Sequence, residues 1–141
     1  MEYVCDAPNG LTWFRLMTEG EAAAESAEMR HAVEKHYCRE RAKAADSFQP
    51  LSSVFIEQEI GKEAHINRAI PLFLTLRDED GKAHVTAMLP PGGRKAENTT
   101  CIVVGLANAD PYVQHADAIA ALAQHFDITL DRADCYPYRR G

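Results

Sequence analysis

The chain has 141 residues, a formal net charge of −6, and 46% hydrophobic and 26% charged residues. This length is typical of one domain with one core, and the composition excludes a disordered or low-complexity protein. The acidic charge comes without a cluster of Lys and Arg, so we expect no direct binding to nucleic acid or to an anionic membrane.

We expect a cytoplasmic protein that folds as a single globular domain over residues 1–141. No apolar run approaches the length of a bilayer span, and the first residues lack the charged and apolar regions of a signal peptide. The cysteines at positions 5, 38, 101 and 135 lie too far apart for a Cys-x-x-Cys motif or a dense disulfide framework. We therefore expect thiols that form no disulfide.

The first 50 residues predict a hairpin followed by a long helix. Residues 1–17 place two short strands around the turn cluster Asp6-Ala-Pro-Asn-Gly10. Thr18-Glu-Gly-Glu21 has the pattern of a capping box, in which Thr and Glu satisfy backbone N–H groups at a helix start. The helix is predicted to run to about Ala45, and Phe48-Gln-Pro50 ends it. Its apolar stripe consists of Ala22, Met29, Val33 and Tyr37.

The middle of the chain predicts a short helix over 53–60, capped by Gly61, and then a β-hairpin over 72–89. A two-residue hairpin loop at Asp80-Gly81 sets one register, and a four-residue loop over 78–81 shifts the pairing by two without exchanging the faces. The first register pairs Leu76 with Val85, Leu74 with Ala87 and Leu72 with Leu89. The second face is semi-apolar and offers a surface for a helix, a ligand or a homodimer partner. It consists of Phe73, Thr75, Thr86 and Met88.

The last third of the chain predicts a strand, a helix and a tail. The apolar run from Thr100 to Leu106 is rich in β-branched residues, as expected of a central strand. Asp110-Pro111 supplies an N-cap and a proline at the first helical position, which predicts a helix over 111–126. Residues 128–130 predict a last short strand, and residues 131–141 a tail.

Together these elements predict an α+β domain with two layers. Its sheet is expected to be mainly antiparallel with about four to six strands. The two main helices, at about 19–45 and 111–126, are expected to pack on one face of that sheet. The order of the strands across the sheet does not follow from the sequence.

Two segments combine side chains that binding sites use. In the 90–99 loop, two glycines stand beside two cations, which could close around a phosphate or a carboxylate, although a mobile loop explains the same residues. At the C-terminus, tyrosines and arginines form either a docking tail or a tail packed by its own rings. A ligand between the sheet and a helix would find polar groups in Arg94, Lys95 and Asn108. The candidate residues are Gly92, Gly93, Arg94, Lys95, Asn108, Tyr136, Tyr138 and Arg139.

We expect no metal and no cofactor, and the sequence identifies no catalytic residue. Glu28 and His31 have the Glu-x-x-His spacing of four-helix di-iron proteins, but it occurs once here and a solvated helix face explains it. Asp78-Glu-Asp-Gly81 lacks the alternating ligands of a calcium loop, and a hairpin turn explains it. Cys101 or Cys135 would be a nucleophile only beside a histidine, and buried cysteines usually act as small hydrophobic residues.

The hairpin Leu72-Phe-Leu-Thr-Leu-Arg-Asp-Glu-Asp-Gly-Lys-Ala-His-Val-Thr-Ala-Met-Leu89 resembles the strand pair with an acidic-glycine turn in the GNAT acyltransferases. The resemblance implies an enzyme that uses an acyl-CoA. In that family a further strand leads into an Arg/Gln-x-x-Gly-x-Gly/Ala loop, whose amides hold the coenzyme pyrophosphate at a helix N-terminus. This chain has Val104-Gly-Leu-Ala-Asn-Ala-Asp-Pro111 instead, without those glycines, so we do not assign it to the family.

The leading hypothesis is a small protein-binding or regulatory protein, such as an acidic inhibitor or an immunity-type partner of a basic protein. It follows from an ordinary core, an acidic charge and the lack of any catalytic spacing. The alternatives are an acyltransferase-like enzyme that uses an acyl-CoA and a small-ligand-binding domain. An enclosed cleft that collects a histidine, a cysteine and a carboxylate would favour catalysis, whereas a flat apolar patch would favour a protein partner.

Overall fold

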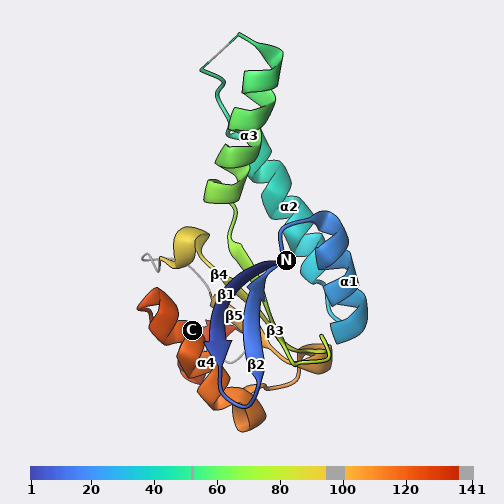
Figure 1. Ribbon diagram of the computed structural model, residues 1–141, viewed down its shortest axis with the longest axis vertical. Helices are drawn as coiled ribbons and strands as arrows, with labels where there is room; N and C mark the ends of the chain where they lie inside the picture. Colours follow the sequence, from blue (N-terminus) through green and yellow to red (C-terminus); the bar gives the residue numbers. More distant parts are fainter. Residues whose placement is uncertain (52, 95–100, 137–141) are drawn as a thin grey trace.

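The computed structural model describes residues 1–51, 53–94 and 101–136 and contains a six-stranded sheet in the order β1-β2-β3-β4-β5-β6 (Figure 1). Neighbouring strands are antiparallel, except for β5 and β6, which are parallel. The α+β class and the predicted size of the sheet are confirmed. The strands are β1 (Glu2–Ala7), β2 (Leu11–Arg15), β3 (Leu72–Arg77), β4 (Ala83–Leu89), β5 (Cys101–Val104) and β6 (Cys135–Tyr136).

Helices cover both faces of the sheet. Leu74 and Val85 belong to a core cluster with the helix α4, whereas Phe73 lies in a second cluster on the opposite face with residues of α1 and α2. The expectation that the main helices share one face is therefore wrong. Alternate residues of β3 point to opposite faces, and because both sets are buried, each face needs its own cover. The helices are α1 (Glu19–Met29), α2 (Val33–Asp46), α3 (Phe55–Ala69) and α4 (Tyr112–Phe126).

The helix predicted over 19–45 is broken into α1 and α2. It starts as predicted, because the Thr18 hydroxyl accepts the N–H of Glu21 at 3.1 Å. The break lies at Arg30, which is left-handed with φ 55° and donates its N–H to Ser26 O. The Ser26 hydroxyl also donates to the carbonyl of His31, so local partners satisfy the backbone groups that the break exposes.

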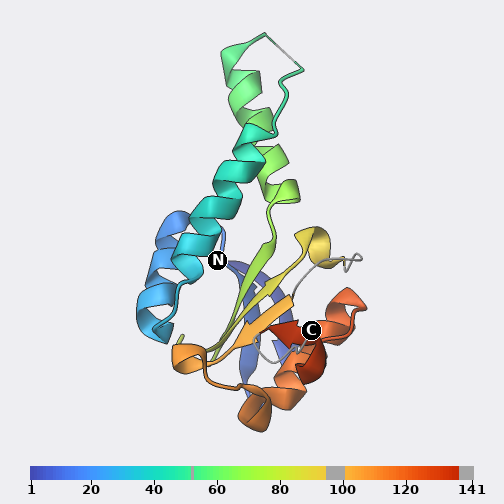
Figure 2. The same cartoon turned by 180° about the vertical axis from the view of Figure 1, so that it is seen from behind.

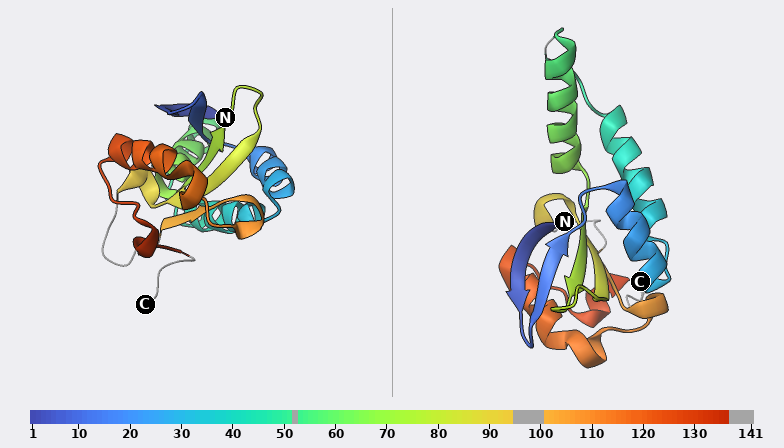
Figure 3. Two further views of the ribbon diagram at one scale, coloured as in Figure 1. Left: turned by 90° about the horizontal axis from the view of Figure 1, so that it is seen from below. Right: turned by 45° about the vertical axis from the view of Figure 1, so that its right-hand side comes forward.

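The helices α2 and α3 run antiparallel and project beyond the sheet as a helical arm, visible from both sides (Figures 1 and 2) and in profile (Figure 3). Gly61 was predicted to end a short helix, but it lies inside α3. A Cβ at Gly61 would stand 3.4 Å from the ring of Phe48, between α2 and α3. This distance is an ordinary contact, so the packing does not require a glycine here. The prediction that Gly61 caps a helix is wrong.

The central hairpin has the pairing that we predicted for the two-residue loop. Leu76 pairs with Val85, and Leu74 with Ala87. A bulge after Leu76 makes the connection longer, and the Asp78 carboxylate holds it by accepting the backbone N–H groups of Asp80 and Lys82 at 2.9 and 3.0 Å. The faces of the hairpin are therefore fixed as the alternation of its residues indicates.

The C-terminal part confirms the predicted helix and changes the last strand. The Asp110 carboxylate accepts the N–H of Tyr112 at 2.9 Å, as a residue at a helix start does. Residues 128–130 form no strand, because their backbone contacts α4 instead: Ile128 donates to Ala123 O, and the Tyr112 hydroxyl donates to Leu130 O. The last strand is β6, within the predicted tail. In the described part of the chain, no helix is long and apolar enough to cross a membrane.

Candidate functional site

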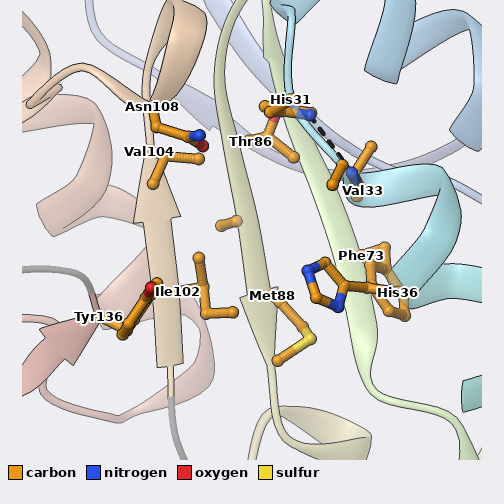
Figure 4. A pocket seen from close by; sticks show the side chains of 12 residues that line it. His31, Val33, His36, Phe73, Thr86, Met88, Ile102, Val104, Asn108 and Tyr136 are labelled. Carbon is orange, nitrogen blue, oxygen red and sulfur yellow. Dashed lines mark hydrogen bonds between the residues drawn. The ribbon is translucent and has the colours of Figure 1, made fainter.

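A pocket lies on the face of the sheet that carries α1 and α2 (Figure 4). Its floor is a cross-strand row in which Phe73 pairs with Met88, Met88 with Ile102, and Ile102 with Tyr136. The pocket has a volume of about 240 Å³. Of the described residues, it is lined by His31, Ala32, Val33, His36, Phe73, Thr86, Ala87, Met88, Ile102, Val104, Asn108 and Tyr136.

The break between α1 and α2 creates this pocket. The helix α1 packs on β4, and α2 starts at Val33, packs Tyr37 edge-on against Phe73 at 5.2 Å between ring centroids, and then leaves the sheet to form the arm. The side chains of Met88 and Ile102 therefore lie beside α2 rather than under it (Figure 4). The pocket lies between the start of α2 and the strands β4, β5 and β6.

A buried ionic network lies next to the pocket. Glu25 on α1 is completely buried, and its carboxylate accepts hydrogen bonds from Arg77 Nη2 at 2.6 Å and from the Thr75 hydroxyl at 2.9 Å. The Thr86 hydroxyl donates to the other carboxylate oxygen. Arg77 also donates to Thr75 Oγ1 at 3.1 Å and to Gly81 O at 3.0 Å. The network connects α1 to the hairpin of β3 and β4. The helix α1 is therefore the element that covers Thr75 and Thr86 on the second face of the hairpin.

His31 joins this network to the wall of the pocket, and its partners fix its tautomer. The Thr86 hydroxyl has already given its proton to Glu25, so it accepts the hydrogen bond of 2.8 Å from His31 Nε2. The other ring nitrogen, Nδ1, accepts the N–H of Val33 at 3.4 Å. His31 is therefore neutral, with its proton on Nε2 and both nitrogens occupied. It shapes the pocket and has no ring nitrogen left for a ligand.

Burial lowers the pKa of His31, and the negative charge of Glu25 opposes this effect only in part. Burial also lowers the pKa values of His36 and His115. Unfolding would let these side chains take up protons at their ordinary pKa of about 6.5. The unfolded state then binds more protons than the folded state, so the free energy of unfolding falls as the pH drops below about 6.5, until the lower folded pKa values are reached.

We therefore expect the protein to lose stability between pH 7 and pH 5, at no more than about 1.4 kcal/mol per pH unit for each histidine. The variant His31→Gln should show a shallower slope, because glutamine can still donate to Thr86 but does not titrate. Urea denaturation at pH 7, 6 and 5 measures this. The carboxyls with lowered pKa, such as Asp78 and Asp110, lose their stabilising effect only near and below their ordinary pKa of about 4. An unchanged slope in His31→Gln would refute the role of this histidine.

Three polar groups at the pocket remain without a hydrogen bond among the described residues. Arg39 donates to His36 Nδ1 at 3.0 Å, and because an arginine only donates, the proton of His36 lies on Nε2 and that N–H is unused. The side-chain amide of Asn108 and the hydroxyl of Tyr136 also make no such bond. His36 lies on the side of α2, and Asn108 and Tyr136 lie on the side of β5 and β6 (Figure 4).

The structure brings two of the candidate residues from the sequence to this pocket. Asn108 and Tyr136 line it, although they are 28 positions apart in the chain. Gly92, Gly93 and Arg94 do not, since they form a short turn elsewhere. The remaining candidates, Lys95, Tyr138 and Arg139, lie outside the described residues.

The turn at Gly92 and Gly93 packs against α4. Both residues have positive φ, 67° and 71°. A Cβ at Gly92 would meet open space, but one at Gly93 would stand 2.3 Å from the ring of Phe126. Close packing against Phe126 therefore explains the glycine at position 93.

The other chemical candidates are separated in the fold. The Glu28 carboxylate accepts the N–H of Ala83 at 2.9 Å, whereas His31 contacts Thr86. Cys101 and Cys135 are buried neighbours on β5 and β6, in the core cluster that faces α4. Among the described residues, no three His, Cys, Asp or Glu side chains are placed to hold a metal ion.

The end of the arm carries an exposed apolar surface, which we call the arm patch. Phe55, Ile56 and Ile60 on α3 have 73, 69 and 66% of their surface exposed. Toward the sheet, Ile66 on the same helix is buried at 2%. The exposure is therefore confined to the outer part of the arm. The arm patch consists of Leu51, Val54, Phe55, Ile56 and Ile60.

Sequence reasoning missed Glu25 and the arm patch. Glu25 lies three residues after Ala22 and four before Met29, on the buried side of α1, but an acidic residue near the start of a helix is also explained by the helix dipole. Thr75 and Thr86, the two threonines placed on the second face of the hairpin, were the signal for a polar partner there. The arm patch was missed because the helix was predicted to end before Gly61, whereas α3 runs from Phe55 to Ala69.

No protein-family model, no curated protein and no solved structure matches this chain.

Proposed function

We propose that this chain is a protein-binding module, which docks the arm patch into an apolar groove of a basic partner protein. The observation that carries the proposal is the set of five large apolar side chains exposed together at the end of the arm. Single exposed apolar residues are normal, but five large ones within positions 51–60 favour an interaction site. The exposed face of α3 is the part that fits a groove.

The spacing on α3 supports a helix-in-groove mode. Ile56 and Ile60 are one helical turn apart, and Phe55 lies beside them, which is the arrangement of anchors in amphipathic helices that bind a groove. An aromatic anchor and two isoleucines supply the kind of side chains that dominate interface energies. The arm projects from the sheet, so a partner can surround this end of α3 without contacting the rest of the protein (Figure 3).

Charge supports a basic partner. Near the arm patch, residues 55–63 contain Glu57 and Glu59 with one cation, Lys62, while Glu63 is paired with Arg41 of α2 at 2.7 Å. The whole chain has a net charge of −6. An apolar groove rimmed by Lys and Arg would complement this surface and would be attracted to it over a distance. An acidic inhibitor or regulator of a basic protein has these properties.

The cysteines support a cytoplasmic location for this module. All four lie in the described part of the chain, and none forms a disulfide there, as is usual in the reducing cytoplasm.

The alternative of an acyl-CoA-dependent acyltransferase has less support. Such enzymes hold the pyrophosphate with free amides at a helix start. The corresponding start of α4 is occupied, because the Asp110 carboxylate accepts the N–H of Tyr112 and also pairs with Arg132 at 2.6 Å. A carboxylate at this position would repel a pyrophosphate.

Photo-crosslinking tests the proposed docking. Benzoylphenylalanine is placed at Phe55 of the full chain, and in a matched control at Val113, which is 86% exposed on α4. We expect an adduct with one basic protein at position 55 in the cytoplasm of the native host and none at position 113. Equal adducts at both positions, or adducts with a second copy of this chain only, would contradict the proposal.

Binding measurements with the purified partner complete the test. We expect Ile56→Ser and Ile60→Ser to weaken binding at least about tenfold each, which corresponds to about 1.4 kcal/mol. Binding should also weaken when the salt concentration rises, because the two surfaces have opposite charge. The control Val113→Ser should bind normally. Unchanged affinity in both isoleucine variants would exclude the arm patch as the docking surface.

A further inference from the structure

We propose that the pocket between α2 and the strands β4, β5 and β6 binds a small neutral molecule with a flat aromatic or heteroaromatic ring and a polar edge. This site is separate from the arm patch, and it does not depend on the proposed docking. The class of ligand follows from the volume of the pocket, the nature of its walls and the position of its unused polar groups.

The volume limits the size of the ligand. A closed apolar cavity of about 150 Å³ holds one benzene molecule, whereas pockets for drug-sized ligands have about 300–1,000 Å³. At about 240 Å³, this pocket has room for a fused pair of rings or for one ring with a short substituent. It is too small to hold an acyl-CoA or a dinucleotide.

The walls favour a flat apolar ring. The floor is a sheet surface formed by Met88 and Ile102, with Phe73 and Val33 at the side of α2 and Val104 at the side of β5 (Figure 4). A planar ring can lie on such a pleated surface and contact the aromatic ring of Phe73 and the sulfur of Met88. The apolar surface that the ring covers would supply most of the affinity.

The uncharged side chains among the described residues that line the pocket favour a neutral ligand. None of its twelve described lining residues is Asp, Glu, Lys or Arg. Its two histidines are neutral near pH 7, because burial lowers the pKa of each. An ionised ligand would lose hydration in this pocket without gaining a partner of opposite charge among these lining residues.

The polar edge of the ligand has defined partners. His36 presents an unused N–H at the side of α2, and the Asn108 amide can donate or accept at the other side. Tyr136, whose ring extends the floor, adds a hydroxyl. A ring with an acceptor nitrogen on its edge can therefore bind His36 while its apolar faces stay on the sheet.

An NMR titration of the full chain with benzimidazole tests the site, because this fused ring is neutral at pH 7 and carries one acceptor and one donor nitrogen. We expect amide shifts at Val33, Thr86 and Ile102, and none at Val113 on α4. Benzimidazole-5-carboxylate, with the same ring and a negative charge, should bind at least about tenfold more weakly. Shifts scattered over the protein, or tighter binding of the carboxylate, would overturn the proposal.

Two variants test separately the apolar floor of the pocket and the polar group that binds the edge of the ligand. Ile102→Phe fills the floor and should abolish benzimidazole binding, and the exposed variant Val113→Ala is its control. His36→Leu should weaken benzimidazole about fivefold, as expected for one hydrogen bond, without weakening indene, a ring of the same shape that lacks nitrogen. If His36→Leu weakens the binding of neither compound, or of both equally, His36 is not the partner of the polar edge of the ligand. This result does not depend on whether Ile102→Phe folds.

Discussion

Trp13→Ala is expected to lower the free energy of unfolding by about 3–5 kcal/mol, because it removes a large side chain from the centre of the core. Trp13 on β2 is completely buried between the sheet and α4. Domains of this kind have a total stability of about 5–15 kcal/mol. The variant should therefore unfold at a much lower urea concentration, and it should be partly unfolded at physiological temperature if the wild-type stability lies at the low end.

The indole of Trp13 also connects two distant parts of the chain. Its Nε1 donates to Ala118 O on α4 at 2.8 Å, across 105 positions in the sequence. Trp13→Phe keeps an aromatic ring but loses this donor and some volume, so it should cost about 1–3 kcal/mol, less than alanine. Urea denaturation of both variants measures the two contributions. Equal costs for phenylalanine and alanine would show that the hydrogen bond, rather than the packing, is the main contribution.

The parts of the fold that were predicted correctly are those that local interactions determine. The hairpin of β3 and β4 was predicted with its two faces because the alternation from Leu72 and the Asp80-Gly81 turn are both short-range signals, and its pairing is one of the two registers that the sequence left open. The start of α4 was predicted because Asp110 acts on the backbone only two residues away.

The parts that were missed depend on contacts between distant segments. Arg30 ends α1 although arginine favours helices, because α2 must turn away to pack Tyr37 on Phe73. Gly61 lies inside α3, where the ring of Phe48 from the other side of the arm lies beside it. Neither contact can be derived from periodicity, which shows the face of a helix but not the partner that covers it.

The pocket shows the same limit at the level of function. The sequence indicated that the second face of the hairpin, which carries Thr86 and Met88, is covered by a helix, a ligand or a homodimer partner, without showing which. The structure shows that α1 covers Thr86 and that the side of Met88 borders the pocket. Asn108 was named as a polar group for a ligand between the sheet and a helix, whereas Tyr136 was named only as part of the tail. The parallel pairing of β6 with β5 brings Tyr136 to this place.

Glu25→Ala is expected to cost about 3–5 kcal/mol, because it leaves Arg77 nearly buried without its main partner. The side chain of Arg77 is only 13% exposed, and its contact with Glu28 at 3.7 Å is longer and lies at the surface. The variant also takes the acceptor from Thr75 and Thr86. Glu28→Ala is the matched control and should cost about 1 kcal/mol, because Glu28 is 38% exposed and accepts one backbone N–H.

The double variant Glu25→Leu with Arg77→Met distinguishes two cases. Either the ion pair itself stabilises the fold, or its loss is costly only because removing one partner leaves the other charge buried and unpaired. We expect each single variant to be strongly destabilised and the double variant to lose clearly less than the sum of the two, because no unpaired charge remains. Urea denaturation gives the three free energies. Costs that simply add would show that the two side chains act independently, and the contact of 2.6 Å between them would then contribute nothing measurable. Because Thr86 links Glu25 to His31, the single variant Glu25→Leu should also shift the amide signals of Val33 at the pocket, and the Glu28→Ala control should not.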